Sequence, residues 1–404
     1  MSSTTLRQRR KEPIKEQEAS VFSRPETQQA FVSFRLALLI TTGIVIATLL
    51  LAYMTSPITA VGVEELTIVE LTGPFELNRK LSKGKQILMS APESIVEHKG
   101  NLYTGLADGR IVKIHPSEDG ALGAGKVEYL TNGIIPKAEK TTEDINHGRA
   151  LGIRIHDNDL YVADAIYGLY KLDLNSKEIT ILVRPSDTNP PMKFPDDLDI
   201  TADGKIVYFS DASYRCPITT LINEALEGTC TSRIFKYHVF THKLETVMTG
   251  LCFGNGVQLT KDEKTLIIPE TTRYRVSWVD TTTWKTKHVL KIPAMPDNVR
   301  MNRHGTYWVG ATSKLSKPLQ FLFRYPFLRQ IVIGLVPANV ILGIPNRKHN
   351  MLFEVNDNGE IIETLHDPDG DLTFAVAQGT ELSDGRIALG TYAAPFLAIA
   401  DRSE

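Results

Sequence analysis

Two hydrophobic patterns divide the chain. Residues 36–54 read LALLITTGIVIATLLLAYM, nineteen residues without a charged side chain. That is about the length a helix needs to cross the hydrocarbon layer of a membrane. From about residue 80 onward, apolar and polar residues alternate in short runs separated by turns rich in Asn, Asp and Gly. Alternation with a period of two predicts β-strands. We therefore expect one transmembrane helix at 36–54 and a large β-domain within 55–404.

The charges around the apolar segment predict its orientation. Acidic residues follow it at positions 64, 65 and 70, and the next basic residue is Arg79. By the positive-inside rule the N-terminus is cytosolic. The polar segment 1–35 is expected to be a disordered cytosolic tail. Seven basic residues precede the apolar segment: Arg7, Arg9, Arg10, Lys11, Lys15, Arg24 and Arg35.

A cleaved signal peptide is the alternative interpretation of the same segment. Its leader would be far shorter than these 35 residues. We therefore favour a retained signal anchor and a single-pass type II topology. The β-domain would then lie in the endoplasmic reticulum lumen or outside the plasma membrane.

One strand pattern recurs six times. A polar turn is followed by a short apolar or aromatic run, centred on Tyr103, Tyr161, Tyr208, Ile267, Trp308 and Leu389. Further alternating strands follow each run, and long amphipathic helices are not predicted between residues 80 and 310. The pattern predicts an all-β domain, a six-bladed β-propeller with four antiparallel strands per blade. A two-sheet sandwich is the alternative, and six similar units argue against it. We expect the last strands, near Tyr392 and Phe396, to close the ring against a strand near 66–71.

The longest interval between repeats contains an apolar insertion at 311–350. Its aromatic residues are interleaved with Arg324 and Arg329, and Pro326 and Pro337 make it too broken to span a bilayer. Two interpretations remain: a helical lid over the mouth of the propeller channel, or a segment at 318–345 lying in the membrane interface. The run 331–335 is also compatible with an ordinary strand against the blade.

Composition excludes several classes of function. The net charge is −2, and no basic repeat indicates a nucleic-acid partner. The three cysteines, Cys216, Cys230 and Cys252, form no CxxC pair, so a zinc site is not expected. A Cys216–Cys230 disulfide would close a short loop and leave Cys252 over, and an unpaired state is the alternative.

Oxygen-bearing residues recur just upstream of the repeat strands. In a propeller these positions lie on the innermost strands, so they would form a ring at one mouth of the channel. A ring of carboxylate and amide oxygens is the ligand type that calcium requires. Turn formation is the alternative role of each single residue. The candidate ligands are Glu93, Asp196, Asn255, Asp297 and Asn298.

The strings PESI, GRALGI, LYVADAIYGL, FPDDLDI, FGNGVQL, PETTRYRVSWV and MPDNVR resemble the strictosidine-synthase-like family over about residues 60–400. The wider superfamily includes the paraoxonases and gluconolactonases. The resemblance implies a six-bladed propeller with calcium at the top of the channel, bound at the five positions above. Asp196 departs from the pattern, since Asn is common there.

Two further positions bear on the chemistry that the resemblance implies. Gln378 stands where strictosidine synthase has its catalytic Glu, and an amide cannot exchange the required proton. Alkaloid synthesis is therefore not expected. His147 is the candidate for activating a water, by analogy with the paraoxonase histidines. The leading hypothesis is a calcium-dependent arylesterase or lactonase acting on a small ester or lactone. The alternative is a non-catalytic, membrane-tethered binding propeller with a structural calcium.

Overall fold

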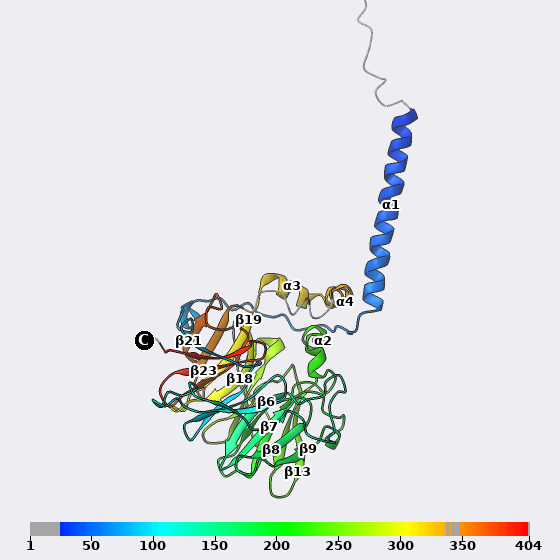
Figure 1. Ribbon diagram of the computed structural model, residues 1–404. Helices are drawn as coiled ribbons and strands as arrows, with labels where there is room; N and C mark the ends of the chain where they lie inside the picture. Colours follow the sequence, from blue (N-terminus) through cyan, green and yellow to red (C-terminus); the bar gives the residue numbers. More distant parts are fainter. Residues whose placement is uncertain (1–24, 337–339, 341–347, 403–404) are drawn as a thin grey trace, which may run out of the picture. The chain divides into compact units, whose positions relative to one another are not determined.

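The computed structural model describes residues 25–336, 340 and 348–402 (Figure 1), which belong to two compact units, 1–55 and 56–404. The part of the expected disordered tail before Pro25 lies outside these residues.

The first unit contains helix α1 (Pro25–Met54). It begins eleven residues before the charge-free segment. Residues 25–35 are therefore helical, whereas the sequence predicted a disordered tail there. Proline is favoured at the first position of a helix, and no Gly or Pro follows until Gly43. The hydroxyls of Thr41 and Thr48 each donate to the carbonyl four residues earlier, at 2.9 Å, so these polar groups are satisfied within the helix. Among the described helices, α1 is the one long and apolar enough to cross a membrane, over Gln29–Met54.

The second unit is a six-bladed β-propeller, which confirms the predicted fold. Each blade is a four-stranded antiparallel sheet. The first three blades, from the channel outward, are β2 (Ile95–His98), β3 (Asn101–Gly105), β4 (Ile111–Ile114) and β5 (Val127–Tyr129); β6 (Ala150–His156), β7 (Asp159–Asp164), β8 (Gly168–Asp173) and β9 (Ile179–Val183); and β10 (Pro195–Ile200), β11 (Ile206–Asp211), β12 (Ser232–His238) and β13 (Lys243–Leu251).

The other three blades complete the ring. The innermost strands contact one another in cyclic order, so they surround one channel. The strands are β14 (Gln258–Leu259), β15 (Thr265–Glu270), β16 (Arg275–Asp280) and β17 (Thr286–Lys291); β18 (Ala294–Met301), β19 (Tyr307–Lys314), β20 (Asn350–Val355) and β21 (Ile361–Asp367); and β22 (Val376–Glu381), β23 (Ile387–Thr391), β24 (Phe396–Ala400) and β1 (Gly84–Leu88).

Each sequence repeat marks the turn and second strand of a blade. In blade 3, Asp203 accepts a hydrogen bond from the Lys205 amide at 3.0 Å, and Gly204 has a φ of +68°. Such Asx turns favour tight connections between antiparallel strands. The strand that follows, β11, buries Val207 and Phe209 completely, and these side chains pack against blade 2. The turn thus fixes the register of β11, and this register directs the apolar side chains of the strand into the space between two blades.

The ring closes with an N-terminal strand, but not the predicted one. The strand that pairs with β24 is β1, Gly84–Leu88, in the register Gly84↔Ala400 to Leu88↔Phe396. Residues 66–71 form no strand. The apolar residues of that segment instead pack individually: Leu66 is buried in a cluster with the helices, and Leu71 packs at the side of blade 5. These side chains are therefore accommodated without strand pairing.

The disulfide joins Cys230 to Cys252, with a Cα–Cα distance of 3.9 Å. The expected Cys216–Cys230 pairing is wrong. Cys230 precedes β12 and Cys252 follows β13, and these strands pair with Ser232 opposite Leu251. The two cysteines therefore meet at the open end of one hairpin. Cys216 is not disulfide-bonded.

The insertion between β19 and β20 contains two helices, α3 (Lys317–Arg324) and α4 (Pro326–Leu335), while residues 337–339 and 341–347 lie outside the described part. The strand alternative for residues 331–335 is therefore wrong. Ser316 caps α3 by accepting from the Leu319 amide, and Pro326 begins α4. Both helices pack with α2 (Leu221–Glu227) over one end of the channel, where Phe323 and Ile333 are buried. The described residues also form four short 3₁₀ turns: η1 (Gly73–Phe75), η2 (Pro185–Asp187), η3 (Ile218–Thr220) and η4 (Thr271–Arg273).

Candidate functional site: a carboxylate-floored cavity at the channel mouth

Four of the five predicted ligands line one cavity. Glu93 precedes β2, Asp196 lies in β10, Asn255 precedes β14 and Asp297 lies in β18. All four side chains line a cavity of about 520 Å³. They come from four different blades, as expected for equivalent positions on strands that surround a channel.

β-Bulges set the direction of two of these side chains, Asp196 and Asp297. The pairing of β10 with β11 shifts register between Pro195 and Leu198, and that of β18 with β19 shifts between Pro296 and Val299. A bulge places two residues opposite one and redirects the side chains. Asp196 consequently lines the cavity, while its neighbour Asp197 is fully buried in a separate ion-pair network.

The walls of the cavity are mostly apolar. Phe194 and Phe253 meet edge to face with 5.5 Å between ring centroids. Helices α2 and α3 contribute further apolar side chains, among them Leu226 and Phe323. An apolar cavity with a few converging polar groups is the usual form of a small-molecule site.

Several buried carboxyl groups lie close together at the floor of the cavity. Burial raises the pKa of Asp196 well above its ordinary value, and the nearby charges of Glu93 and Asp297 raise it further. Burial also raises the pKa of Asp297, and the charges of Glu93 and Asp197 raise it further. A hydrogen bond with the side chain of Asn255 lowers it. Bringing these carboxylates together out of water is costly without a compensating cation.

Arg149 supplies part of that compensation. Its guanidinium donates to Glu93 Oε2 at 2.9 Å and to the Ala91 carbonyl at 3.0 Å. Burial raises the pKa of Glu93, and the charge of Arg149 opposes that rise. Arg149 therefore fixes one oxygen of Glu93 and leaves Asp196 and Asp297 without an ion-pair partner among the described residues.

The remaining oxygens fit a calcium ion. Oδ1 of Asp196, Asn255 and Asp297 is in each case buried without a hydrogen bond from any described residue. Together with Glu93 these are hard oxygen donors, and calcium accepts further ligands from water. The donor set therefore matches calcium better than a metal that prefers sulfur or imidazole.

Three other residues singled out in the sequence do not line the cavity. Asn298 is fully buried, and neither atom of its amide is bonded within the described structure. His147 is half-buried, with Nδ1 2.8 Å from the Gly148 carbonyl oxygen. Gln378 donates to the Ile95 carbonyl at 2.8 Å and to Thr380. The structure thus brings together four of the five predicted ligands, and His147 is not beside them.

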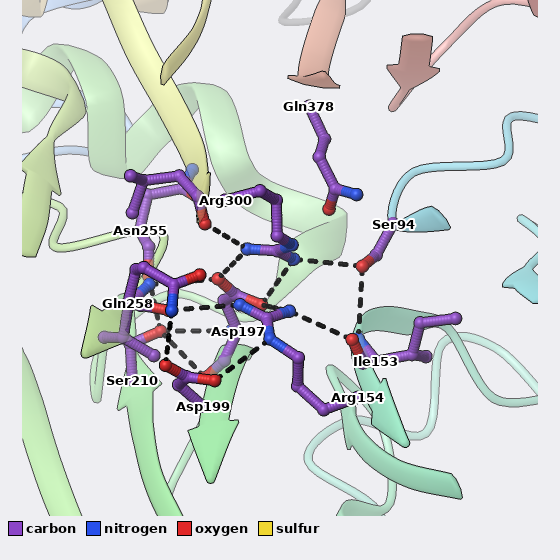
Figure 2. Close-up of polar contacts among 12 residues, drawn as sticks. Ser94, Ile153, Arg154, Asp197, Asp199, Ser210, Asn255, Gln258, Arg300 and Gln378 are labelled. Carbon is purple, nitrogen blue, oxygen red and sulfur yellow. Dashed lines mark hydrogen bonds and ion pairs between the residues drawn. The ribbon is translucent and has the colours of Figure 1, made fainter. Parts of the chain in front are cut away.

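A buried ion-pair network occupies the channel beside this floor, and Figure 2 shows its members pointing toward one another. Arg300 donates to both carboxylate oxygens of Asp197, at 2.8 and 2.9 Å, and to Ser94 at 2.9 Å. Arg154 donates to Asp199 at 3.2 Å, and Gln258 donates to the same carboxylate at 2.7 Å. The innermost strands are thereby cross-linked by charges that the sequence analysis did not select.

Comparisons with known proteins agree with this architecture. A family model for strictosidine synthase matches residues 196–309, and one for the strictosidine-synthase-like N-terminal region matches residues 73–114. The chain is 31% identical over 390 residues to adipocyte plasma membrane-associated protein from Salmo salar, covering 92% of this chain and 91% of that protein. It is 31% identical over 343 residues to the Homo sapiens protein of the same name, covering 81% and 80%.

A solved structure with the same fold is the calcium-binding protein regucalcin from Agrobacterium tumefaciens. It has a TM-score of 0.50 and 12% sequence identity, and the match covers 79% of this chain and 94% of that one. At this identity the similarity concerns the fold alone. The sequence matches, which extend over nearly the whole chain, go further: the chain belongs to the strictosidine-synthase-like family.

Proposed function

We propose that this protein is a membrane-anchored, calcium-dependent hydrolase of the arylesterase or lactonase type. The observation that carries the proposal is the set of unpaired, buried oxygens of Asp196, Asn255 and Asp297 at the floor of an apolar cavity. The related regucalcin structure is of a calcium-binding protein, and it supports the choice of metal.

Each part of the cavity has a role in this proposal. Glu93, Asp196, Asn255 and Asp297 would hold the calcium ion, which when bound polarises an ester carbonyl and stabilises negative charge on its oxygen. The phenylalanine pair and the residues of α2 and α3 would hold the apolar part of the substrate and exclude water. Arg149 keeps Glu93 in place. Because His147 does not line the cavity, a floor carboxylate is the better candidate to accept the proton of the attacking water.

The test uses the full chain in lipid nanodiscs with a panel of phenyl esters and lactones. We expect hydrolysis that is abolished by a calcium chelator and restored by calcium. Asn255→Ala removes one proposed ligand, so it should weaken calcium binding and lower the rate at limiting calcium, with at least partial recovery at higher calcium concentrations. Asn175→Ala is the matched control, since Asn175 is exposed on a surface turn. Hydrolysis that persists in chelator would contradict the proposal.

A second candidate is a binding propeller with a structural calcium. The position of His147 away from the cavity favours it, because no histidine stands among the described cavity-lining residues. In this case calcium raises the melting temperature without turnover of any ester. At a free concentration of about 100 times Kd, binding to the folded state alone contributes roughly 2.7 kcal/mol.

We also propose a type II orientation, with α1 as the anchor. The basic residues before α1 favour a cytosolic N-terminus, and the Cys230–Cys252 disulfide favours an oxidising compartment for the propeller. The related proteins named above carry the description plasma membrane-associated. Protease added to intact cells or sealed microsomes distinguishes the two orientations, since only a cytosolic propeller is digested in microsomes.

A further inference from the structure

The outer surface of α3 and α4 exposes large apolar side chains. Phe321 is 57% exposed, Phe327 51% and Leu335 47%. The opposite side of the same helices is packed, with Phe323 and Ile333 buried against α2 and the linker after α1. Aromatic residues presented together on one side of a helix pair favour a partner surface rather than water.

The charges on this surface suit a lipid headgroup layer. No Asp or Glu occurs between Asp297 and Glu354, a range that includes both helices. Lys317 and Arg324 are exposed on α3, and neither forms an ion pair with a described residue. Glu64 and Glu65 line the same groove as Lys317 and Arg324, and their negative charges offset the two positive charges. Attachment through this surface should therefore depend on the apolar side chains and not require anionic lipid.

The covalent chain limits the distance between this surface and the membrane. Ala60 donates from its amide to Gln330 of α4 at 3.3 Å, and Arg329 of α4 donates to the Val61 carbonyl. The Val61 amide donates to the Glu227 carbonyl of α2 at 2.9 Å. Ala60 is six residues after Met54, the last residue of the apolar helix, and an extended chain of six residues reaches at most about 22 Å. Whatever the orientation of α1, the chain therefore limits the distance between Met54 and Ala60, the residue that bonds to α4, to about 22 Å.

We propose that the exposed side of α3 and α4, formed by Phe321, Phe327 and Leu335, lies in the interfacial layer of the bilayer that α1 spans. The same α3 contributes Leu319, Leu322 and Phe323 to the cavity wall. The cavity would then be separated from the lipid by one helix, and an apolar ligand could pass between bilayer and cavity without crossing water. The inference does not depend on calcium or on hydrolysis.

The test measures contact between single side chains and lipid in the full chain. Phe321→Trp and Phe327→Trp are reconstituted in nanodiscs of phosphatidylcholine with or without brominated acyl chains, since bromine quenches tryptophan fluorescence on contact. We expect the added fluorescence to fall roughly twofold in brominated discs, because interfacial helices lie about 5–10 Å into the headgroup and acyl boundary. The three native tryptophans give a background that all variants share: Trp278 and Trp308 are buried, and Trp284 is partly buried.

The matched control is Phe240→Trp. Phe240 is 72% exposed in the turn between β12 and β13, which is not part of the α3–α4 surface, and its fluorescence should be equal in both discs. Equal fluorescence of Phe321→Trp and Phe327→Trp in the two kinds of disc would overturn the proposal. Because all three positions are exposed, unchanged melting temperatures are expected and confirm that each variant is folded. Loss of esterase activity would not affect this readout, so the two proposals fail separately.

Discussion

Arg300→Met should destabilise the propeller by about 3 kcal/mol. The guanidinium makes two charged hydrogen bonds to Asp197, at 2.8 and 2.9 Å, and both side chains are buried. Removing one partner of a buried ion pair typically costs about 3–5 kcal/mol, because the other charge is left without compensation. We expect the lower end of this range, because Asp197 keeps its hydrogen bond from the Val257 amide at 2.9 Å and its ion pair with Arg154 at 3.6 Å.

The partner substitution tests the reason for this loss. In the double variant Asp197→Asn, Arg300→Met the uncompensated charge is absent, so the double variant should be more stable than the sum of the two single effects predicts. We expect a coupling of at least about 1 kcal/mol. The comparison isolates the charge because Asn has nearly the shape of Asp.

Urea unfolding of the full chain in detergent micelles provides the measurement. Trp278 and Trp308 are buried in the propeller and report its unfolding by fluorescence. A loss below about 1 kcal/mol for Arg300→Met, or additive effects in the double variant, would refute the reasoning. Either result would mean that the network contributes little to holding the innermost strands together.

Three further substitutions test other parts of the propeller. Burial lowers the pKa of His366 from 6.5 to about 4, so the unfolded chain takes up the proton first as pH falls. Stability should then decline between pH 6.5 and 4 by up to about 3 kcal/mol, and His366→Gln should flatten that decline. Gly390→Ala should cost about 1–3 kcal/mol, since its Cβ would lie 1.8 Å from the Glu93 carbonyl oxygen. Cys230→Ser should cost about 3 kcal/mol, because it opens a disulfide loop with a sequence separation of 22 residues.

Each of these expectations has a control or a contradicting result. A stability–pH curve with the same slope in His366→Gln would show that another group titrates. Gly62→Ala is the control for Gly390, since nothing lies within 4 Å of its added Cβ, and equal effects of the two would exclude steric crowding. Mass spectrometry of the wild-type protein alkylated in denaturant without reductant should identify Cys216 as the only labelled cysteine, and labelling of Cys252 would contradict the disulfide.

The fold could be predicted because its signals are local and repeated. Asx turns such as that at Asp203, followed by alternating strands, determine each hairpin independently of the rest of the chain. Closure by β1 and not by residues 66–71 could not be predicted in this way, because pairing at the ring seam depends on the position of β24 in space. The same limit applies to Cys230 and Cys252, which only the β12–β13 register brings together.

The site was predicted in part for the same reason. Glu93, Asp196, Asn255 and Asp297 lie at equivalent positions before or within innermost strands, so their convergence follows from the repeat. Asn298 and Asp197 are the next residues after Asp297 and Asp196. The bulges that turn these neighbouring side chains in different directions have no recognisable sequence pattern, so their separation could not be predicted. Arg154 and Arg300 could have been found in the sequence. Both lie on innermost strands, at positions where the period-two alternation directs the side chain into the channel.

The seam between β1 and β24 affects how the protein can be made. A ribosome releases β1 long before it synthesises residues 396–400, so blade 6 cannot be completed until translation has passed that point. Until then β23 and β1 each present an unpaired edge, the kind of surface that recruits strands from other chains. A premature stop that removed only β24 would therefore leave five finished blades and an open ring, and such a product is a substrate for quality control rather than a slightly shorter propeller.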